Sequence, residues 1–303
     1  MIYFELFNPI TVFLFFVFTI VSGIFTMNPV ISIISFLSSL LYWMLLPCKK
    51  NKSIHIFSFL MVIACTVLNP VLGHNGMTAL VVINNHVVSA ESLWYGAFLG
   101  IMLSSATYWF ASYSALMTSD KIIYVVNAFS KKAALVLTMA MRFIPMYVKK
   151  ARQINLSQKA LGLYKDETIV SRVRGTLRVM SALLTYMIEK TIITSDSMEA
   201  RGYFSGKRRT FSVYSFGKKD IVYIVTVVLL SLCTFYVSFK GALVYNFYPS
   251  MDSVSHSLLS LFGYFSFGLL CLSPSVTQGS YRLKWRYLKS KISHSDIRIP
   301  ARY

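Results

Sequence analysis

The sequence predicts an all-α, polytopic membrane protein with about five or six transmembrane helices and a cytoplasmic domain of long amphipathic helices. Hydrophobic residues make up 55% of the 303-residue chain, and its mean hydropathy is +0.59, outside the range of ordinary soluble domains. The apolar residues gather in runs long enough to cross roughly 30 Å of hydrocarbon. One long basic stretch with helical periodicity lies between these runs.

Six apolar runs predict the transmembrane helices, and none of them contains Asp, Glu, Lys or Arg. Four define an N-terminal transmembrane domain over residues 1–120, and two define C-terminal transmembrane helices within residues 220–280. The last run is short and contains Gly and Ser, so it could be a tilted or partial span. Ion-coupled transporters need ionisable side chains within the membrane to bind or relay the coupling ion. The absence of such side chains from these runs argues against an ion-coupled transporter. The runs are residues 10–27, 29–47, 54–72, 93–117, 221–239 and 257–273.

The basic residues predict the orientation. Lys49, Lys50 and Lys52 lie between the second and third runs, whereas the loop over residues 73–92 has no Lys or Arg. Cytoplasmic loops carry the excess of Lys and Arg. We therefore expect the N-terminus, residues 118–132 and the basic C-terminal tail, residues 281–303, on the cytoplasmic side.

Residues 121–219 predict a cytoplasmic domain of long helices. The run Ala133–Val148 carries Arg142 and Pro145 and is short for a span, so we interpret it as a cytoplasmic or interfacial helix. One long helix is expected from about Met146 to Ala160, ending at Gly162, and a second from about Ser171 to Ala200, ending at Gly202. Apolar residues three or four apart give the second helix one greasy face. They are Val173, Leu177, Met180, Leu184, Met187 with Ile188, Ile192 and Met198.

The greasy face suits contact with a partner protein or with the membrane surface. A basic amphipathic helix can also serve only to bind anionic lipid headgroups. Contact with a partner or the membrane surface, and binding of lipid headgroups alone, therefore both stay open as interpretations of this helix.

The second helix ends in an arginine between two small residues, Ala200-Arg201-Gly202. A cation in the last turn is favoured by the helix dipole, and Gly202 can adopt the left-handed conformation that ends a helix. An exposed guanidinium could enter a partner's groove, because it stays charged and offers a rigid fork to a carboxylate. The same pattern also fits a simple helix cap, so both interpretations stay open at this point.

Several segments in order resemble the transmembrane T component of energy-coupling-factor transporters, over roughly residues 60–215. These are "LNPVLGHNGMTAL" (68–80), "ESLWYGAFLGIMLSSA" (91–106), "MAMRFIPMYVKKA" (139–151), "KKARQINLSQKALGL" (149–163) and "DSMEARGYFSGKRRT" (196–210). The resemblance implies two cytoplasmic coupling helices, each ending in a small-Arg-small triplet that docks onto an ATPase subunit. The docking residues would be Ala200, Arg201 and Gly202, and Ala160, Leu161 and Gly162. Leu161 departs from the family's usual Arg. We therefore expect two different docks, that is, contacts of a helix end with an ATPase subunit: an apolar dock at Leu161 and an ionic dock at Arg201.

The resemblance also implies the partners and the location. It predicts a subunit of an importer in the prokaryotic plasma membrane, working with two ABC-type ATPase subunits and a small membrane S component that binds a vitamin or a cobalt or nickel ion. The lipid bilayer is a further partner, and no nucleic acid is expected. The alternative is a conventional ABC permease or another multi-pass transporter subunit, although the permease's coupling loop motif does not follow Glu199-Ala200.

No catalytic residue, cofactor or metal site is predicted, so the chain is not expected to be an enzyme. The stretch "GYFSGKR" (202–208) lacks the spacing of a phosphate loop and has Arg208 where Ser or Thr should stand. His74, His86 and His256, in predicted outer loops, are the only candidates for a metal site. The four scattered cysteines are interpreted as packing residues.

Overall fold

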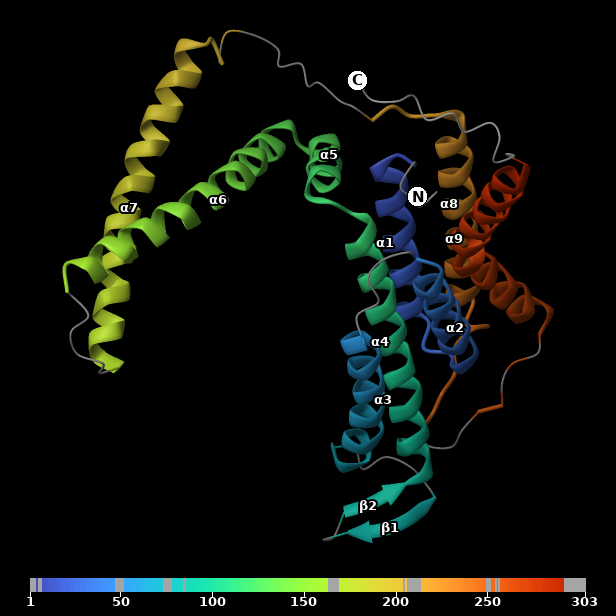
Figure 1. The fold of residues 1–303 in the computed structure, drawn as a ribbon. Helices are drawn as coiled ribbons and strands as arrows, with labels where there is room; N and C mark the ends of the chain where they lie inside the picture. Colours follow the sequence, from blue (N-terminus) through green and yellow to red (C-terminus); the bar gives the residue numbers. More distant parts are fainter. Residues whose placement is uncertain are drawn as a thin grey trace. The chain divides into compact units, whose positions relative to one another are not determined.

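The chain divides into two compact units, each described here by itself. Unit 1 comprises residues 1–122 and 214–303, and unit 2 comprises residues 123–213 (Figure 1). The computed structural model describes residues 4, 7–46, 52–72, 78–83, 86–162, 169–203, 205, 214–248, 252–253, 255 and 257–291.

Unit 1 is a bundle of helices from both ends of the sequence (Figure 1). Helix α4 packs against α1, α2 and α3, while α9 packs against α2 and α8, and α1 packs against α8. The six helices are α1 (Pro9–Phe25), α2 (Pro29–Leu45), α3 (Lys52–Leu72), α4 (Ala90–Leu116), α8 (Lys218–Phe239) and α9 (Leu258–Lys291).

Each predicted apolar run falls mainly within one of these six helices. Three of the described helices are long and apolar enough to cross a membrane, over Lys52–Val71, Lys218–Phe239 and Leu258–Leu288. Helices α1 and α2 are shorter apolar helices of 17 residues each. The chain therefore has the helices of a membrane protein, and the full number of spans stays a prediction.

Two features of the helices were not predicted. Helix α9 continues through Lys291, so the predicted span over residues 257–273 and the start of the basic tail belong to one helix. Residues 118–132, for which only a cytoplasmic location was predicted, include helix α5 (Ser119–Phe129). The Asn-Pro pair Asn69-Pro70 lies in the last turn of α3, inside the predicted apolar run over residues 54–72.

The predicted outer loop contains a short antiparallel hairpin, the exception to an otherwise helical chain in the described residues. Strand β1 (Ala79–Ile83) pairs with β2 (His86–Ser89), which leads directly into α4. The backbone N–H and the hydroxyl of Thr78 donate to the buried carboxylate of Glu91, at 3.2 and 2.7 Å. The carboxylate thus ties the start of the hairpin to the first turn of α4.

Helices α3 and α4 approach each other closely at two glycines one turn apart. A Cβ on Gly96 would lie 2.6 Å from the carbonyl oxygen of Cys65, and one on Gly100 would lie 2.8 Å from the Cα of Val62. Small residues at this spacing let helix backbones meet in a membrane. Ser104 continues the spacing and forms a hydrogen bond with a serine of α3.

Aromatic rings fill the centre of unit 1 and join its N-terminal and C-terminal helices. Phe4 is fully buried, with its ring centroid 5.6 Å from that of Tyr223 on α8 and 5.7 Å from that of Phe15 on α1. Tyr42 of α2 stacks on Trp109 of α4 at 6.1 Å. Such pairs contribute about 0.5–1.5 kcal/mol each beyond burial of their surface.

Buried polar side chains fix the helix ends of unit 1. Asn8 and Asn28 cap α1 and α2, each followed by a proline at the first helical position. The carboxylate of Asp220 accepts hydrogen bonds from the backbone N–H of Asn8, at 2.8 Å, and of Gly217, at 2.9 Å. Asp220 therefore joins the start of α1 to the start of α8.

Unit 2 contains two long helices, α6 (Lys131–Ala160) and α7 (Ile169–Ala200), which cross each other (Figure 1). At the crossing, the rings of Tyr147 and Tyr186 meet edge to face with centroids 6.4 Å apart. The ammonium of Lys150 lies 5.0 Å from the centroid of the Tyr186 ring. This aromatic and cationic contact lies where the two helices cross.

The expected boundary at Met146 is wrong, because the helices predicted over Ala133–Val148 and from about Met146 to Ala160 form one helix. Helix α6 begins at Lys131, where the Ser130 hydroxyl accepts from the backbone N–H of Ala133, and it carries Pro145 inside. An interior proline costs about 3 kcal/mol or more because one backbone hydrogen bond is lost. The Ala-, Leu- and Met-rich sequence before it has high helix propensity, which favours continuation.

We predict that Gly100→Ala destabilises the bundle by about 1–3 kcal/mol, because overpacking a tight contact forces backbone shifts. Gly279→Ala is the matched control, since a Cβ there meets nothing within 4 Å. Thermal unfolding of the two variants in detergent, followed by fluorescence-detected size-exclusion chromatography, measures the difference. Equal melting temperatures would contradict the close contact of α3 with α4.

Candidate functional site

Helix α7 ends in a complete Schellman motif that places Arg201 at the C-cap. The backbone N–H of Tyr203 donates to the carbonyl of Met198 at 3.1 Å, and that of Gly202 donates to the carbonyl of Glu199 at 2.8 Å. Gly202 has φ +74°, as its predicted left-handed conformation requires. The main chain therefore satisfies the last carbonyls itself, and the Arg201 side chain is not needed for the cap.

Helix α6 also ends at a left-handed glycine, with Leu161 in the place that Arg201 has on α7. The backbone N–H of Gly162 donates to the carbonyl of Lys159 at 3.0 Å, and Gly162 has φ +69°. Leu161 is the C-cap residue of α6. In both triplets, residues 160–162 and 200–202, the C-cap residue is thus followed by a left-handed glycine whose N–H donates three residues back.

The side chains at both caps are uncovered. Leu161 is 75% exposed, although it is apolar, and Arg201 is exposed as well. In the part of the chain that the structure describes, the Arg201 side chain has no hydrogen bond or ion pair. Ala160 and Ala200 add little bulk beside them. Each helix end therefore offers one accessible side chain of a different chemistry.

A basic groove of about 540 Å³ lies between the diverging halves of α6 and α7. Arg142 and Lys190 line it together with Arg201. Its walls are apolar side chains of both helices, among them Phe143 and Ile193. No local sequence pattern places Arg142 and Lys190 beside Arg201, because only the crossing of the helices brings them there.

The predicted greasy face of α7 is exposed. Leu183, which is 8% exposed, belongs to another face of the helix. An uncovered apolar face of this length suits contact with another surface. Six of its predicted members are more than half exposed: Val173, Leu177, Met180, Leu184, Ile188 and Ile192.

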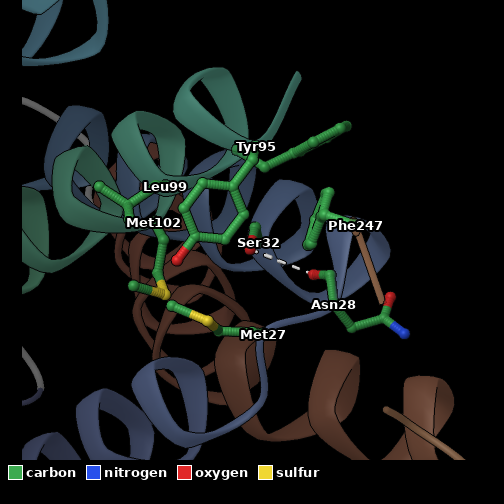
Figure 2. A pocket seen from close by; sticks show the side chains of 8 residues that line it. Met27, Asn28, Ser32, Tyr95, Leu99, Met102 and Phe247 are labelled. Atoms are coloured by element: carbon green, nitrogen blue, oxygen red, sulfur yellow. Dashed lines mark hydrogen bonds between the residues drawn. The ribbon is translucent and has the colours of Figure 1, made fainter. Parts of the chain in front are cut away.

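A separate pocket in unit 1 lies between α2, α4 and the segment at Phe247 (Figure 2). The polar side chains of Ser32 and Asn28 that line it form hydrogen bonds within the protein. The Ser32 hydroxyl donates to the backbone carbonyl of Asn28 at 3.1 Å. The Asn28 amide donates to the carbonyl of Leu243 and to the hydroxyl of Tyr264. We therefore do not assign this pocket a ligand.

Some candidates from the sequence cannot be placed. His74, His256 and the basic residues 206–213 lie outside the described residues, as does the side chain of His86. The described site is therefore limited to the two helix ends and the groove beside Arg201.

One family of known proteins matches most of the chain. The family CbiQ, described as cobalt transport protein, matches residues 7–212, which is more than half of the chain. The chain belongs to the CbiQ family. The match covers both helix ends of the candidate site and most of the bundle.

Curated relatives of this CbiQ-family chain are named energy-coupling factor transporter transmembrane protein EcfT. The relative from Bacillus selenitireducens is 29% identical over 110 residues, which cover 36% of this chain and 41% of the relative. Those from Streptococcus equi and Lactobacillus helveticus are 28% identical over 103 and 99 residues, covering 33% and 32% of this chain and 38% and 36% of the relatives. The aligned segment thus spans about two-fifths of each relative's length.

We predict that Gly202→Val frays the end of α7, because a left-handed conformation costs an L-residue about 1–2 kcal/mol. Gly202→Asn is the control, since Asn is tolerated at this position of the motif. Hydrogen–deuterium exchange of peptides over residues 195–203 measures the opening of the last turn. Exchange in the Val variant that is no faster than in the Asn variant would contradict the described cap.

Proposed function

We propose that this CbiQ-family protein is the T component of an energy-coupling-factor importer. It would transmit ATP-driven motion of two separate ABC-type ATPase subunits to a small membrane S component that binds a vitamin or a cobalt or nickel ion. One observation carries the proposal: two equivalent caps leave Leu161 and Arg201 uncovered at the ends of two long, crossed helices. The names of the curated relatives support the same role.

The shape of unit 2 suits transmission of motion. At 1.5 Å per residue, the 30 residues of α6 and the 32 of α7 reach roughly 45 and 48 Å. The helices touch at Tyr147 and Tyr186, so a displacement of one end can tilt the pair about that contact. ATP can drive such a motion only if the docked ends bind the two ATPase states differently.

The two docks are expected to differ in chemistry. The Arg201 guanidinium is always charged and can bind a carboxylate with two parallel hydrogen bonds. Leu161 offers only apolar surface, so its partner groove should be apolar. These ends would fit two ATPase subunits that differ in sequence. They would also fit two identical ATPase subunits, of which one is bound more tightly than the other.

The proposal assigns ATP hydrolysis and substrate binding to other chains. In it, the protein lies in a prokaryotic plasma membrane with its N-terminus and unit 2 in the cytoplasm. The basic residues between the second and third helices, and the absence of Lys and Arg from residues 73–92, support this orientation.

We predict that Arg201→Ala weakens ATPase docking by about 2–5 kcal/mol, because it leaves the partner's buried charge unpaired. Arg174→Ala is the matched control: Arg174 is also exposed on α7 and lies within a Val-Arg-Gly triplet near the other end. Co-purification of tagged variants from native membranes, with identification of the co-eluting chains, measures docking. Normal ATPase recovery with Arg201→Ala would refute this role for Arg201.

The apolar dock should respond differently to salt. High salt weakens the interaction of exposed charges. At high salt, the ATPase that still co-purifies with the protein should therefore be held mainly by Leu161. We expect Leu161→Ala to lower retention at both low and high salt, and Arg201→Ala to lower it mainly at low salt. The same salt dependence for both variants would rule out one ionic and one apolar dock.

A further inference from the structure

A second basic groove, of about 830 Å³, lies between the first turns of α8 and the C-terminal half of α9. Its volume is within the range of sites that hold small molecules. Lys218 and Lys219 enter from α8, and Lys284 enters from α9. The groove lies within unit 1 and shares no residue with the proposed ATPase docks.

The charge in this groove is not balanced by the residues that line it. No acidic side chain is among the described lining residues. The closest acid in sequence, Asp220, is buried, and its carboxylate already accepts from the backbone N–H groups of Asn8 and Gly217. Within the described part of the chain, none of the three lysines forms an ion pair. Three exposed ammonium groups around one hollow therefore favour the approach of an anion.

Aromatic and hydroxyl groups complete the groove. The hydroxyls of Tyr223 and Ser273 are 2.8 Å apart, and this contact joins α8 to α9 at the groove. Trp285 and Tyr281 line the α9 side, and Ser280 adds a hydroxyl beside them. Trp, Tyr and Lys together are typical of the level where a membrane protein meets the lipid headgroups.

The surface beside the groove is apolar. Val222 at its edge is 63% exposed, Leu229 two turns further along α8 is 56% exposed, and Val276 of α9 is 65% exposed. Both helices are long and apolar enough to cross a membrane. An anion bound here would therefore stand next to surface that suits acyl chains.

We infer that this groove binds the phosphate headgroup of an anionic phospholipid from the surrounding bilayer. Lys218, Lys219 and Lys284 bind the phosphate, while the acyl chains lie on the exposed apolar residues of α8 and α9. Basic pockets between transmembrane helices are suited to such headgroups. The lipid would join the start of α8 to the end of α9.

The test compares lipids retained by the full chain in detergent. Native mass spectrometry with added phosphatidylglycerol or phosphatidylcholine should give one tightly retained phosphatidylglycerol. Changing Lys218, Lys219 and Lys284 to Gln should weaken its binding about ten- to a hundredfold. The control changes Lys132, Lys149 and Lys159 of α6 to Gln, which removes the same charge. Equal losses in both variants, or equal retention of phosphatidylcholine, would overturn the inference.

A second measurement uses the unaltered lysines, in case the triple variant does not fold. Brominated phosphatidylglycerol should quench the fluorescence of Trp285, measured as the difference between the wild type and Trp285→Phe. Brominated phosphatidylcholine should quench it less. Displacement of the lipid by inorganic phosphate alone would assign the groove to a soluble anion and overturn the lipid as its occupant.

Discussion

Helix ends leave backbone groups without partners, and the way this chain satisfies them determines which side chains stand uncovered. In unit 1, side chains satisfy these backbone groups. Asn8 and Asn28 cap their helices, and the Asp220 carboxylate accepts hydrogen bonds from backbone N–H groups of two segments far apart in the sequence. At the ends of α6 and α7, left-handed glycines let the main chain satisfy its own carbonyls. Because no side chain is required there, the residue before each glycine is available to a partner.

The two units differ in how their helices are stabilised. Unit 1 has a buried aromatic centre and helices that pack on several neighbours, with α3 and α4 in backbone contact at two glycines. In unit 2, α6 and α7 meet at one crossing, and the greasy face of α7 is exposed. Long helices owe most of their stability to packing of such a face. We therefore expect the membrane surface or a partner to cover it, which fits an element that moves between two bound states.

The sequence predicted the parts of the fold that depend on local pattern. Apolar runs located the six bundle helices, and Gly162 and Gly202 marked the ends of the long ones. The two helices predicted on either side of Pro145 are one helix, α6, which continues through the proline. The hairpin was not predicted, although the Val-rich outer loop has residues that favour strands. The spacing of Gly96 and Gly100 was a usable signal for close packing. The groove of Arg142 and Lys190 depends on how α6 and α7 cross, which no local pattern contains.

Site-specific photo-crosslinking in native membranes tests the central claim most directly. A photoreactive residue in place of Leu161 or of Tyr203, which leaves Arg201 intact, should give adducts with ABC-type ATPase subunits on the cytoplasmic side. The same residue in place of Arg174, at the opposite end of α7, should not. Adducts from positions 161 and 203 that contain no nucleotidase, or that form only with probes confined to the outside of the cell, would contradict the account.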